Sequence, residues 1–151
     1  MTESPASLLL VLAVLLPFTG VIIGLLLGGR HVRTVALTTV ALGLAVIIGI
    51  VWHALNASTA MEYVLGGWSP PLGIRLRADG LSVLMLLAVA VVVSLVSVYA
   101  HADFAPHESG KETRAPLIFW LMLLAIWGSL NLVFVSGDLF TLYVALELLT
   151  F

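Results

Sequence analysis

One carboxylate of this chain, that of Glu147, lies among bulky apolar residues in the last stretch of the sequence. If a helix begins after Asp138, Glu147 lies about 13 Å along its axis, at about 1.5 Å per residue. That depth is close to the centre of a bilayer whose hydrocarbon core is about 30 Å thick. An acid at this depth must be protonated, paired or hydrated, so it indicates a functional site. We therefore predict that Glu147 acts as a proton relay; the alternative is a solvated acid at the headgroup surface.

Several polar side chains could assist this acid. Tyr143 and Thr150 share a helix face with Glu147, because residues three and four apart are neighbours on a helix, and either hydroxyl could hydrogen-bond the carboxylate. Four polar residues of the two preceding apolar segments could line a hydrated path: Ser94, Ser97, Ser129 and Asn131. Taken singly, such residues more often form hydrogen bonds between helices.

The sequence contains no other constellation of catalytic or ligand-binding residues. The count of zero cysteines excludes disulfides, thiolate metal sites and cysteine nucleophiles. His53 and His101 fall at the ends of apolar segments, where an interfacial role is more typical than a proton relay. We expect no cofactor and no metal. The net charge of −2, without a cluster of basic residues, predicts no nucleic-acid partner.

The composition is that of an integral membrane protein. Of the 151 residues, 62% are hydrophobic and 9% are charged, and the mean hydropathy is +1.20, whereas a soluble domain is about 25% charged. Segments of about 20 apolar residues can cross a bilayer. The predicted spans are residues 8–29, 34–55, 80–101, 116–135 and, incompletely, 139–151. The predicted fold class is an all-α integral membrane protein: a bundle of four transmembrane helices plus the start of a fifth, in one membrane domain over residues 1–151.

The polar segments between the spans predict how the helices begin and how they are connected. Asp79 and Asp138 are predicted N-caps, because a short acidic side chain can accept the free amides of a first helical turn. Residues 56–78 are rich in proline and glycine and predict a loop. Within it, the alternation of residues 74–77 predicts a short strand.

Two stripes of small residues predict close helix packing. Small residues at four-residue spacing let two helix backbones approach each other within a membrane. The first stripe is Gly20, Gly24 and Gly28, and the second is Ala41, Ala45 and Gly49. We interpret both stripes as packing faces inside one bundle, with a dimerisation face as the alternative.

Basic residues in short connections predict the orientation of the chain, because such residues stay on the cytoplasmic side. The first and third connections carry Arg30, Arg33, Lys111 and Arg114, whereas the second carries Arg75 and Arg77. This bias places the first and third connections inside and the N-terminus outside.

The last apolar segment is too short to cross the membrane. From Asp138 to Phe151 a helix extends about 21 Å, less than the hydrocarbon core. We interpret the sequence as a fragment or as one piece of a split subunit. Another chain would then supply the remaining helices.

Three motifs resemble a known family. Residues 66–74 read GGWSPPLGI and are followed by DGLS at 79–82, and residues 137–147 read GDLFTLYVALE. With Leu15-Leu16-Pro17, they resemble the antiporter-like membrane subunits of Mrp-type cation/proton antiporters, of the proton-pumping arm of respiratory complex I and of membrane-bound hydrogenases. The resemblance covers nearly the whole chain but only about the N-terminal third of a full subunit. The loop is most similar to that of the D-type subunit of Mrp antiporters.

The resemblance implies a role in transport. The family's fifth-helix glutamate is a central ionisable residue of the proton path, and Glu147 matches its position. The chain is therefore expected to contribute to proton or Na⁺/H⁺ translocation within a multisubunit complex of the inner cell membrane. The alternatives are a proton-translocating subunit of NADH-quinone oxidoreductase or a membrane-bound hydrogenase, and a non-conducting assembly subunit. A transporter subunit is favoured over a catalytic enzyme.

Overall fold

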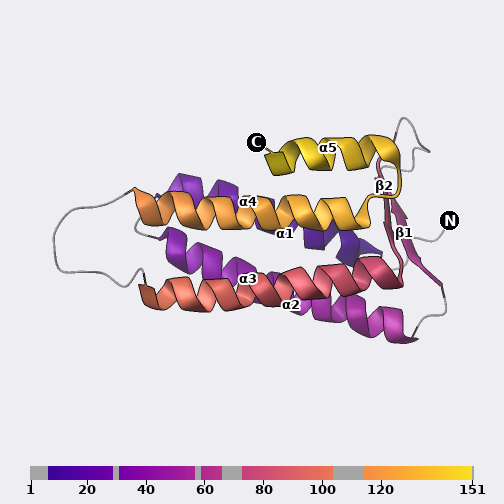
Figure 1. The fold of residues 1–151 in the computed structure, drawn as a ribbon, viewed down its shortest axis with the longest axis horizontal. Helices are drawn as coiled ribbons and strands as arrows, with labels where there is room; N and C mark the ends of the chain where they lie inside the picture. The colour runs from indigo at the N-terminus through magenta and orange to yellow at the C-terminus, as the bar shows by residue number, and fades with distance from the viewer. Residues whose placement is uncertain (1–6, 29–30, 57–58, 66–72, 104–113, 151) are drawn as a thin grey trace.

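The computed structural model describes residues 7–28, 31–56, 59–65, 73–103 and 114–150 of the chain. Its elements, in order, are α1 (Leu8–Leu27), α2 (Val32–Asn56), β1 (Met61–Val64), β2 (Arg75–Ala78), α3 (Gly80–Asp103), α4 (Ala115–Val135) and α5 (Leu139–Thr150) (Figure 1). Four helices are long and apolar enough to cross a membrane, and α5 is a shorter apolar helix. The predicted bundle of four transmembrane helices with the start of a fifth is confirmed.

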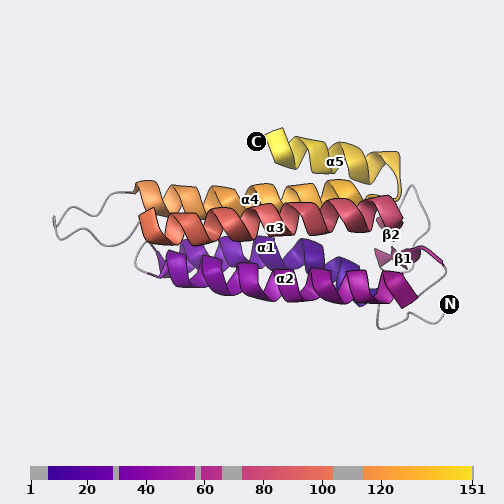
Figure 2. The same cartoon turned by 60° about the horizontal axis from the view of Figure 1, so that its bottom comes forward.

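The helices form two layers. Figure 2 shows α1 and α2 in one layer and α3 and α4 in the other, with α5 lying over the second layer. Within the bundle, α1 packs on α2 and α4, and α2 also packs on α3. Helix α5 packs chiefly on α4. At about 1.5 Å per residue, the 12 residues of α5 extend about half as far as the 21 of α4, and α5 ends near the middle of the bundle (Figure 1).

Apolar side chains lie on both the inside and the outside of this bundle. Trp120, Trp127 and Leu86 are fully buried and belong to the core of the bundle. On the outer surface, Leu26 is 81% exposed and Leu95 is 65% exposed. An apolar surface of this extent is unstable in water but matches lipid acyl chains. The same composition therefore forms both the core and the membrane-facing surface.

The connection between α2 and α3 is an antiparallel hairpin, with Tyr63 of β1 opposite Leu76 of β2. The short strand predicted from residues 74–77 is present as β2. Its partner β1 is not among the predicted elements, because the proline and glycine content of residues 56–78 predicts a loop. The Arg75 guanidinium donates to both Glu62 carboxylate oxygens at 2.8 Å. Part of the predicted loop, residues 66–72, lies outside the described residues.

The two stripes of small residues have different outcomes. Gly20 lies against Thr39 and Gly24 against Leu121, so these two residues pack inside the bundle as predicted. Gly28 does not, because it follows the end of α1 with a φ of 73° and has open space where a Cβ would lie. In α2, Ala41 and Ala45 are exposed, and the prediction that they form a packing face is wrong. Gly49, the third predicted residue, is half-buried against Leu9. The small residues of α2 that are buried include Ala36 and Gly43, because the rotation of α2 is set by its contacts with three other helices, which sequence spacing does not reveal.

The two ends of the bundle carry different groups. Arg33, at the start of α2, donates from Nε to His101 Nδ1 at 2.9 Å and from Nη2 to the His101 carbonyl oxygen at 2.9 Å. The hairpin lies at the opposite end, beside the starts of α3 and α5 (Figure 1). The start of α2 and the end of α3 therefore lie at one end of the bundle and the hairpin at the other, as a membrane-spanning bundle requires.

This arrangement yields a test of the predicted orientation. Thr59 and His31 are exposed at opposite ends, and the chain has no native cysteine. Because basic connections stay cytoplasmic, Thr59→Cys is expected to react with a membrane-impermeant maleimide on intact cells, and His31→Cys only after permeabilisation. The reverse pattern would show that the N-terminus lies inside.

Candidate functional site

Helix α5 begins at a well-formed cap. The Asp138 carboxylate accepts from the Thr141 amide at 2.8 Å and from the Thr141 hydroxyl at 2.7 Å. Burial alone would raise the pKa of Asp138, but these hydrogen bonds and those from the Arg75 and Phe140 amides lower it below its ordinary value. Asp79 accepts from the Ser82 amide at 2.9 Å before α3, and this hydrogen bond lowers the pKa of Asp79. Both aspartates therefore have the geometry predicted for N-caps.

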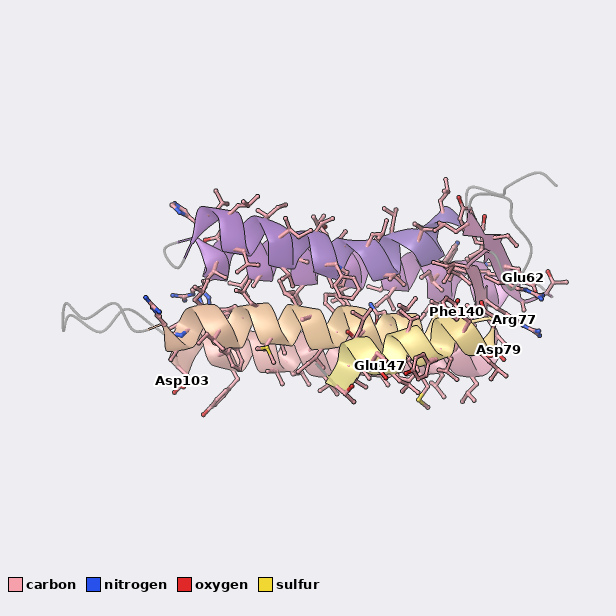
Figure 3. All side chains as sticks on the ribbon, turned by 90° about the horizontal axis from the view of Figure 1, so that it is seen from above. Glu62, Arg77, Asp79, Asp103, Phe140 and Glu147 are labelled. Atoms are coloured by element: carbon pink, nitrogen blue, oxygen red, sulfur yellow. The ribbon has the colours of Figure 1, made fainter. Side chains whose placement is uncertain are left out.

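Glu147 lies in the last turn of α5, on the face that points away from α4. Thr141 and Ala145 are buried against the bundle, whereas Tyr143 and Glu147 are exposed. Figure 3 shows Phe140 nearer the hairpin end of α5 than Glu147. Among the residues that the structure describes, no hydrogen bond or ion pair involves the Glu147 carboxylate. Its place about 13 Å along α5 puts it near the middle of the bundle's length.

In the described part of the chain, the two hydroxyls predicted to assist Glu147 make no hydrogen bond to its carboxylate. The Thr150 hydroxyl donates to the carbonyl oxygens of Leu146 and Glu147, at 3.2 and 3.1 Å. Threonine hydroxyls in helices commonly donate to the carbonyls of the preceding turn. The Thr150 hydroxyl therefore donates its proton to backbone carbonyls and not to the Glu147 carboxylate. Tyr143 is 62% exposed, and within the described residues its hydroxyl makes no hydrogen bond to the acid.

Several known proteins are similar to this chain in sequence. No model of a protein family matches the chain. A putative antiporter subunit mnhD2 of Staphylococcus epidermidis is 27% identical over 145 residues, which are 95% of this chain and 28% of that protein. The D-type subunit of a Na(+)/H(+) antiporter of Bacillus subtilis is 27% identical over 140 residues, 92% of this chain and 27% of its own length. The mnhD2 protein of Staphylococcus aureus is 29% identical over 150 residues.

The chain is homologous to the D-type subunits of these antiporters. It spans a little over a quarter of the length of the curated relatives that it matches. The resemblance predicted from its motifs is thereby confirmed. A chain in the structure of the membrane-bound sulfane sulfur reductase, an archaeal respiratory membrane complex, has the same fold, with a TM-score of 0.77 at 18% identity over 93% of this chain and 28% of that one.

Two serines of α3 and α4 make hydrogen bonds within their own helices. Ser129 donates to the Ala125 carbonyl at 2.9 Å and Ser94 to the Ala90 carbonyl at 2.7 Å. Ser97 and Asn131 are buried in the bundle. Asn131 faces α1 whereas Glu147 points outward from α5, so the structure does not join them into one path with Glu147.

Asn131 compensates for a proline. Because Pro17 has no N–H, it cannot bond the carbonyl four residues earlier, which is that of Ala13. The Asn131 side-chain amide donates to this Ala13 carbonyl at 2.8 Å. Pro17, Ala13 and Asn131 are all buried. A carbonyl left free by a proline in an apolar interior is thus satisfied by a side chain of α4, which links α4 to α1.

This hydrogen bond predicts that substitutions at positions 131 and 17 have coupled effects on the free energy of unfolding. Asn131→Leu leaves the Ala13 carbonyl unpaired, and we expect a loss of about 1–3 kcal/mol of unfolding free energy. In a Pro17→Ala background residue 17 can bond Ala13 itself, so the same Asn131→Leu change should cost less, by about 1 kcal/mol. Unfolding of the four variants in detergent measures this double-mutant cycle. Equal costs in both backgrounds would contradict the compensation.

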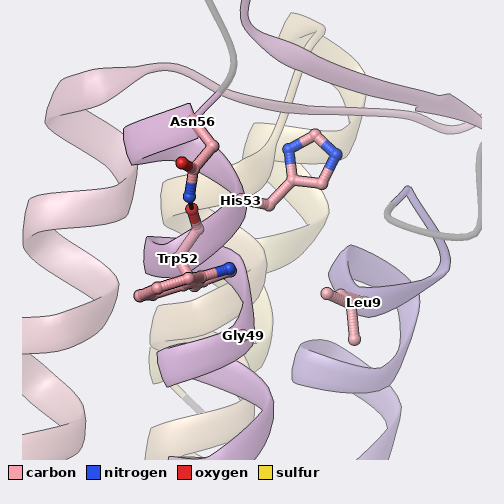
Figure 4. A pocket seen from close by; sticks show the side chains of 5 residues that line it. All are labelled: Leu9, Gly49, Trp52, His53 and Asn56. Carbon is pink, nitrogen blue, oxygen red and sulfur yellow. Dashed lines mark hydrogen bonds between the residues drawn. The ribbon is translucent and has the colours of Figure 1, made fainter.

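The two histidines predicted to lie at helix ends do so. His101 accepts from Arg33 at the end of α3, as described above. His53 lines a cavity of roughly 350 Å³ with Leu9, Gly49, Trp52 and Asn56 (Figure 4). Asn56 there donates to the Trp52 carbonyl at 2.7 Å, and the cavity is mainly apolar. Neither histidine lies on α5 with Glu147.

Proposed function

We propose that the chain contributes to Na⁺/H⁺ or proton translocation as part of an antiporter subunit, with Glu147 as a proton relay. The observation that carries the proposal is the position of Glu147. Its carboxylate lies at mid-depth of an apolar bundle, on an outward face of α5, without a protein partner among the described residues. An acid in such a position is costly unless another group or water meets it. Relatives named as antiporter subunits support a transport role.

In this proposal, Glu147 takes up a proton from one side of the membrane and releases it to the other. A carboxyl group can do this when a neighbouring charge or water alternately favours its charged and neutral forms. The outward face of α5 leaves the acid open to a helix from elsewhere in the assembly. We therefore propose that further membrane helices, from the same subunit or another chain, complete the path.

The homologues belong to multisubunit membrane assemblies, so membrane partner subunits are implied for this multi-pass chain. We propose the inner cell membrane as its location. The chain by itself is expected not to transport, because no cationic partner for Glu147 is found on the helices that the structure describes. An assembly role without conduction is the alternative.

The test is exchange by the assembled complex that contains this chain. In everted vesicles with an imposed pH gradient, adding Na⁺ should dissipate the gradient, as reported by a pH-sensitive dye. Proton movement that instead requires an electron donor would favour the respiratory alternative. A complete complex that moves protons in neither assay would overturn the proposed function.

A further inference from the structure

The start of α5 is joined to the hairpin at the end of the bundle. The Gly137 amide donates to the Arg75 carbonyl at 2.8 Å, and Ser136 forms an antiparallel bridge with Leu76. A Cβ at position 137 would lie 2.8 Å from that same carbonyl oxygen, so only glycine fits. The connection between α4 and α5 therefore extends the two-stranded sheet along the free edge of β2.

The Asp138 carboxylate is shared between the hairpin and α5. One oxygen accepts from the Thr141 amide. The other accepts from the Thr141 hydroxyl at 2.7 Å and from the Arg75 amide at 3.3 Å. Arg75 is itself held to β1, because its guanidinium donates to both oxygens of Glu62. A continuous set of hydrogen bonds thus runs from β1 through β2 and Asp138 into the first turn of α5.

This junction matters because, among the residues that the structure describes, α5 has few contacts beyond α4. Helix α5 packs chiefly on α4, through the buried Thr141 and Ala145. One line of contact along a single helix leaves α5 free to slide or rotate unless its start is held. An α-helix is a rigid element with a fixed rise per residue, so the position of Asp138 sets the depth and rotation of Glu147 about 13 Å away.

We propose that Asp138 is a positioning residue for Glu147: by linking β2 to the first turn of α5, it fixes where Glu147 lies in the membrane. The inference rests on the proposed function of Glu147 for its effect on transport, but the positioning itself does not. The low pKa of Asp138 agrees with a carboxylate that accepts hydrogen bonds from both sides. Asp138 itself does not transfer a proton in this scheme.

The matched variants are Asp138→Asn and Asp79→Asn. Asparagine is as good an N-cap as aspartate, so both variants keep their helix caps. At position 138, however, the amide nitrogen replaces the oxygen that accepts from Arg75, and two donors then face each other. Asp79 caps α3, and within the described residues its carboxylate makes no hydrogen bond to the hairpin, although the Arg77 charge acts on it. The pair therefore separates loss of the hairpin link from loss of a negative charge at a helix start.

The positioning is measured without transport. A spin label on Leu148→Cys, which is exposed on α5, reports its depth in liposomes through collisions with dissolved oxygen and with a water-soluble nickel complex. In the assembled complex, Asp138→Asn should change this depth and Asp79→Asn should not. An unchanged depth in a well-assembled Asp138→Asn complex would overturn the inference, whether or not Glu147 relays protons.

Transport provides the second measurement. A misplacement of 1 Å at a reacting group can cost about 100-fold in rate, so we expect Asp138→Asn to slow exchange about tenfold. The pH profile of exchange should also shift, because Glu147 then meets a different environment. A merely destabilising change would lower the amount of complex and leave the profile of the remainder unchanged, and that result would count against positioning.

A second pair of variants covers the case in which Asp138→Asn does not assemble. Arg75→Pro and Arg75→Ala both remove the guanidinium, but only proline removes the amide that donates to Asp138. Proline is tolerated at the edge of a sheet, where this amide points. A depth change in Arg75→Pro but not in Arg75→Ala supports the inference, and equal depths in both overturn it.

The failure of the proposed function and the failure of this inference can be told apart. If Glu147→Gln transports like the wild type, the proposed function fails, while the depth of the spin label still decides whether Asp138 positions α5.

Discussion

Glu147→Gln is expected to abolish most of the proton-coupled transport of the assembled complex while leaving its assembly intact. Glutamine keeps the size and hydrogen-bonding capacity of the side chain but cannot release a proton. Proton transfer by a positioned side chain typically contributes about 10²–10⁴-fold, so we expect a loss of at least about 100-fold. Because Glu147 is exposed on α5, its replacement removes no packing contact of the bundle.

Two further variants are needed to interpret the transport rate of Glu147→Gln. Glu147→Asp keeps the acid but withdraws it by one methylene, so part of the activity should remain. Asp103→Asn is the matched control, because Asp103 is an exposed carboxylate at the end of α3 (Figure 3). Exposed charges are screened by salt over about 8 Å, so this change should have little effect. Initial rates of dye response per amount of co-purified complex give the comparison.

Wild-type transport by a well-assembled Glu147→Gln complex would leave Glu147 with a structural role at most. A similar loss in Asp103→Asn would also argue against a relay, because it would indicate a general effect of charge. Only the specific order, with Glu147→Gln lowest, Glu147→Asp intermediate and Asp103→Asn near the wild type, agrees with a titrating acid in the path.

Gly43→Val is expected to prevent stable packing of α2 against α4. A Cβ at position 43 would lie 3.0 Å from Cζ3 and 3.1 Å from Cζ2 of the Trp127 indole, and closer still to its Cη2. Trp127 is fully buried and therefore cannot turn away without displacing other helices. Overpacking a core typically costs about 1–3 kcal/mol, and the branched side chain of valine should place this variant at the upper end or beyond.

The control lies two residues along the same helix. Ala45 is exposed, so Ala45→Val adds the same kind of side chain toward lipid and should leave stability nearly unchanged. The yield of folded protein and its unfolding temperature in detergent measure both variants. If Gly43→Val were as stable as Ala45→Val, the result would contradict the close packing of α2 on the Trp127 ring.

The difference between these two positions illustrates what the sequence alone could not provide. Spacing selected Ala41, Ala45 and Gly49 as the packing face of α2, and it passed over Gly43. A four-residue repeat identifies a stripe but not the direction in which the stripe points. A buried glycine opposite a large aromatic residue is a signal of close packing, but it can be recognised only once the partner, Trp127 on another helix, is known.

Asn131 makes the same point for the candidate site. The sequence correctly singled it out as a polar residue inside an apolar helix, and it offered a hydrated path or a bond between helices. The structure selects the bond, because Asn131 lies opposite the one carbonyl of α1 that Pro17 leaves free. Pro17 and Asn131 are both visible in the sequence, but their proximity depends on how α1 and α4 pack.

By itself, the sequence determined the features that depend on composition and on near neighbours. The apolar segments, the caps at Asp79 and Asp138, a short strand near residues 74–77 and the distance of Glu147 along its helix all follow from local rules. Helix rise, strand alternation and first-turn hydrogen bonds involve residues only a few positions apart. The tertiary structure alone decided the pairing of β1 with β2, the link from Arg75 to Asp138 and the outward direction of Glu147. These depend on contacts between residues far apart in the chain, whose geometry is set by how the helices pack against one another.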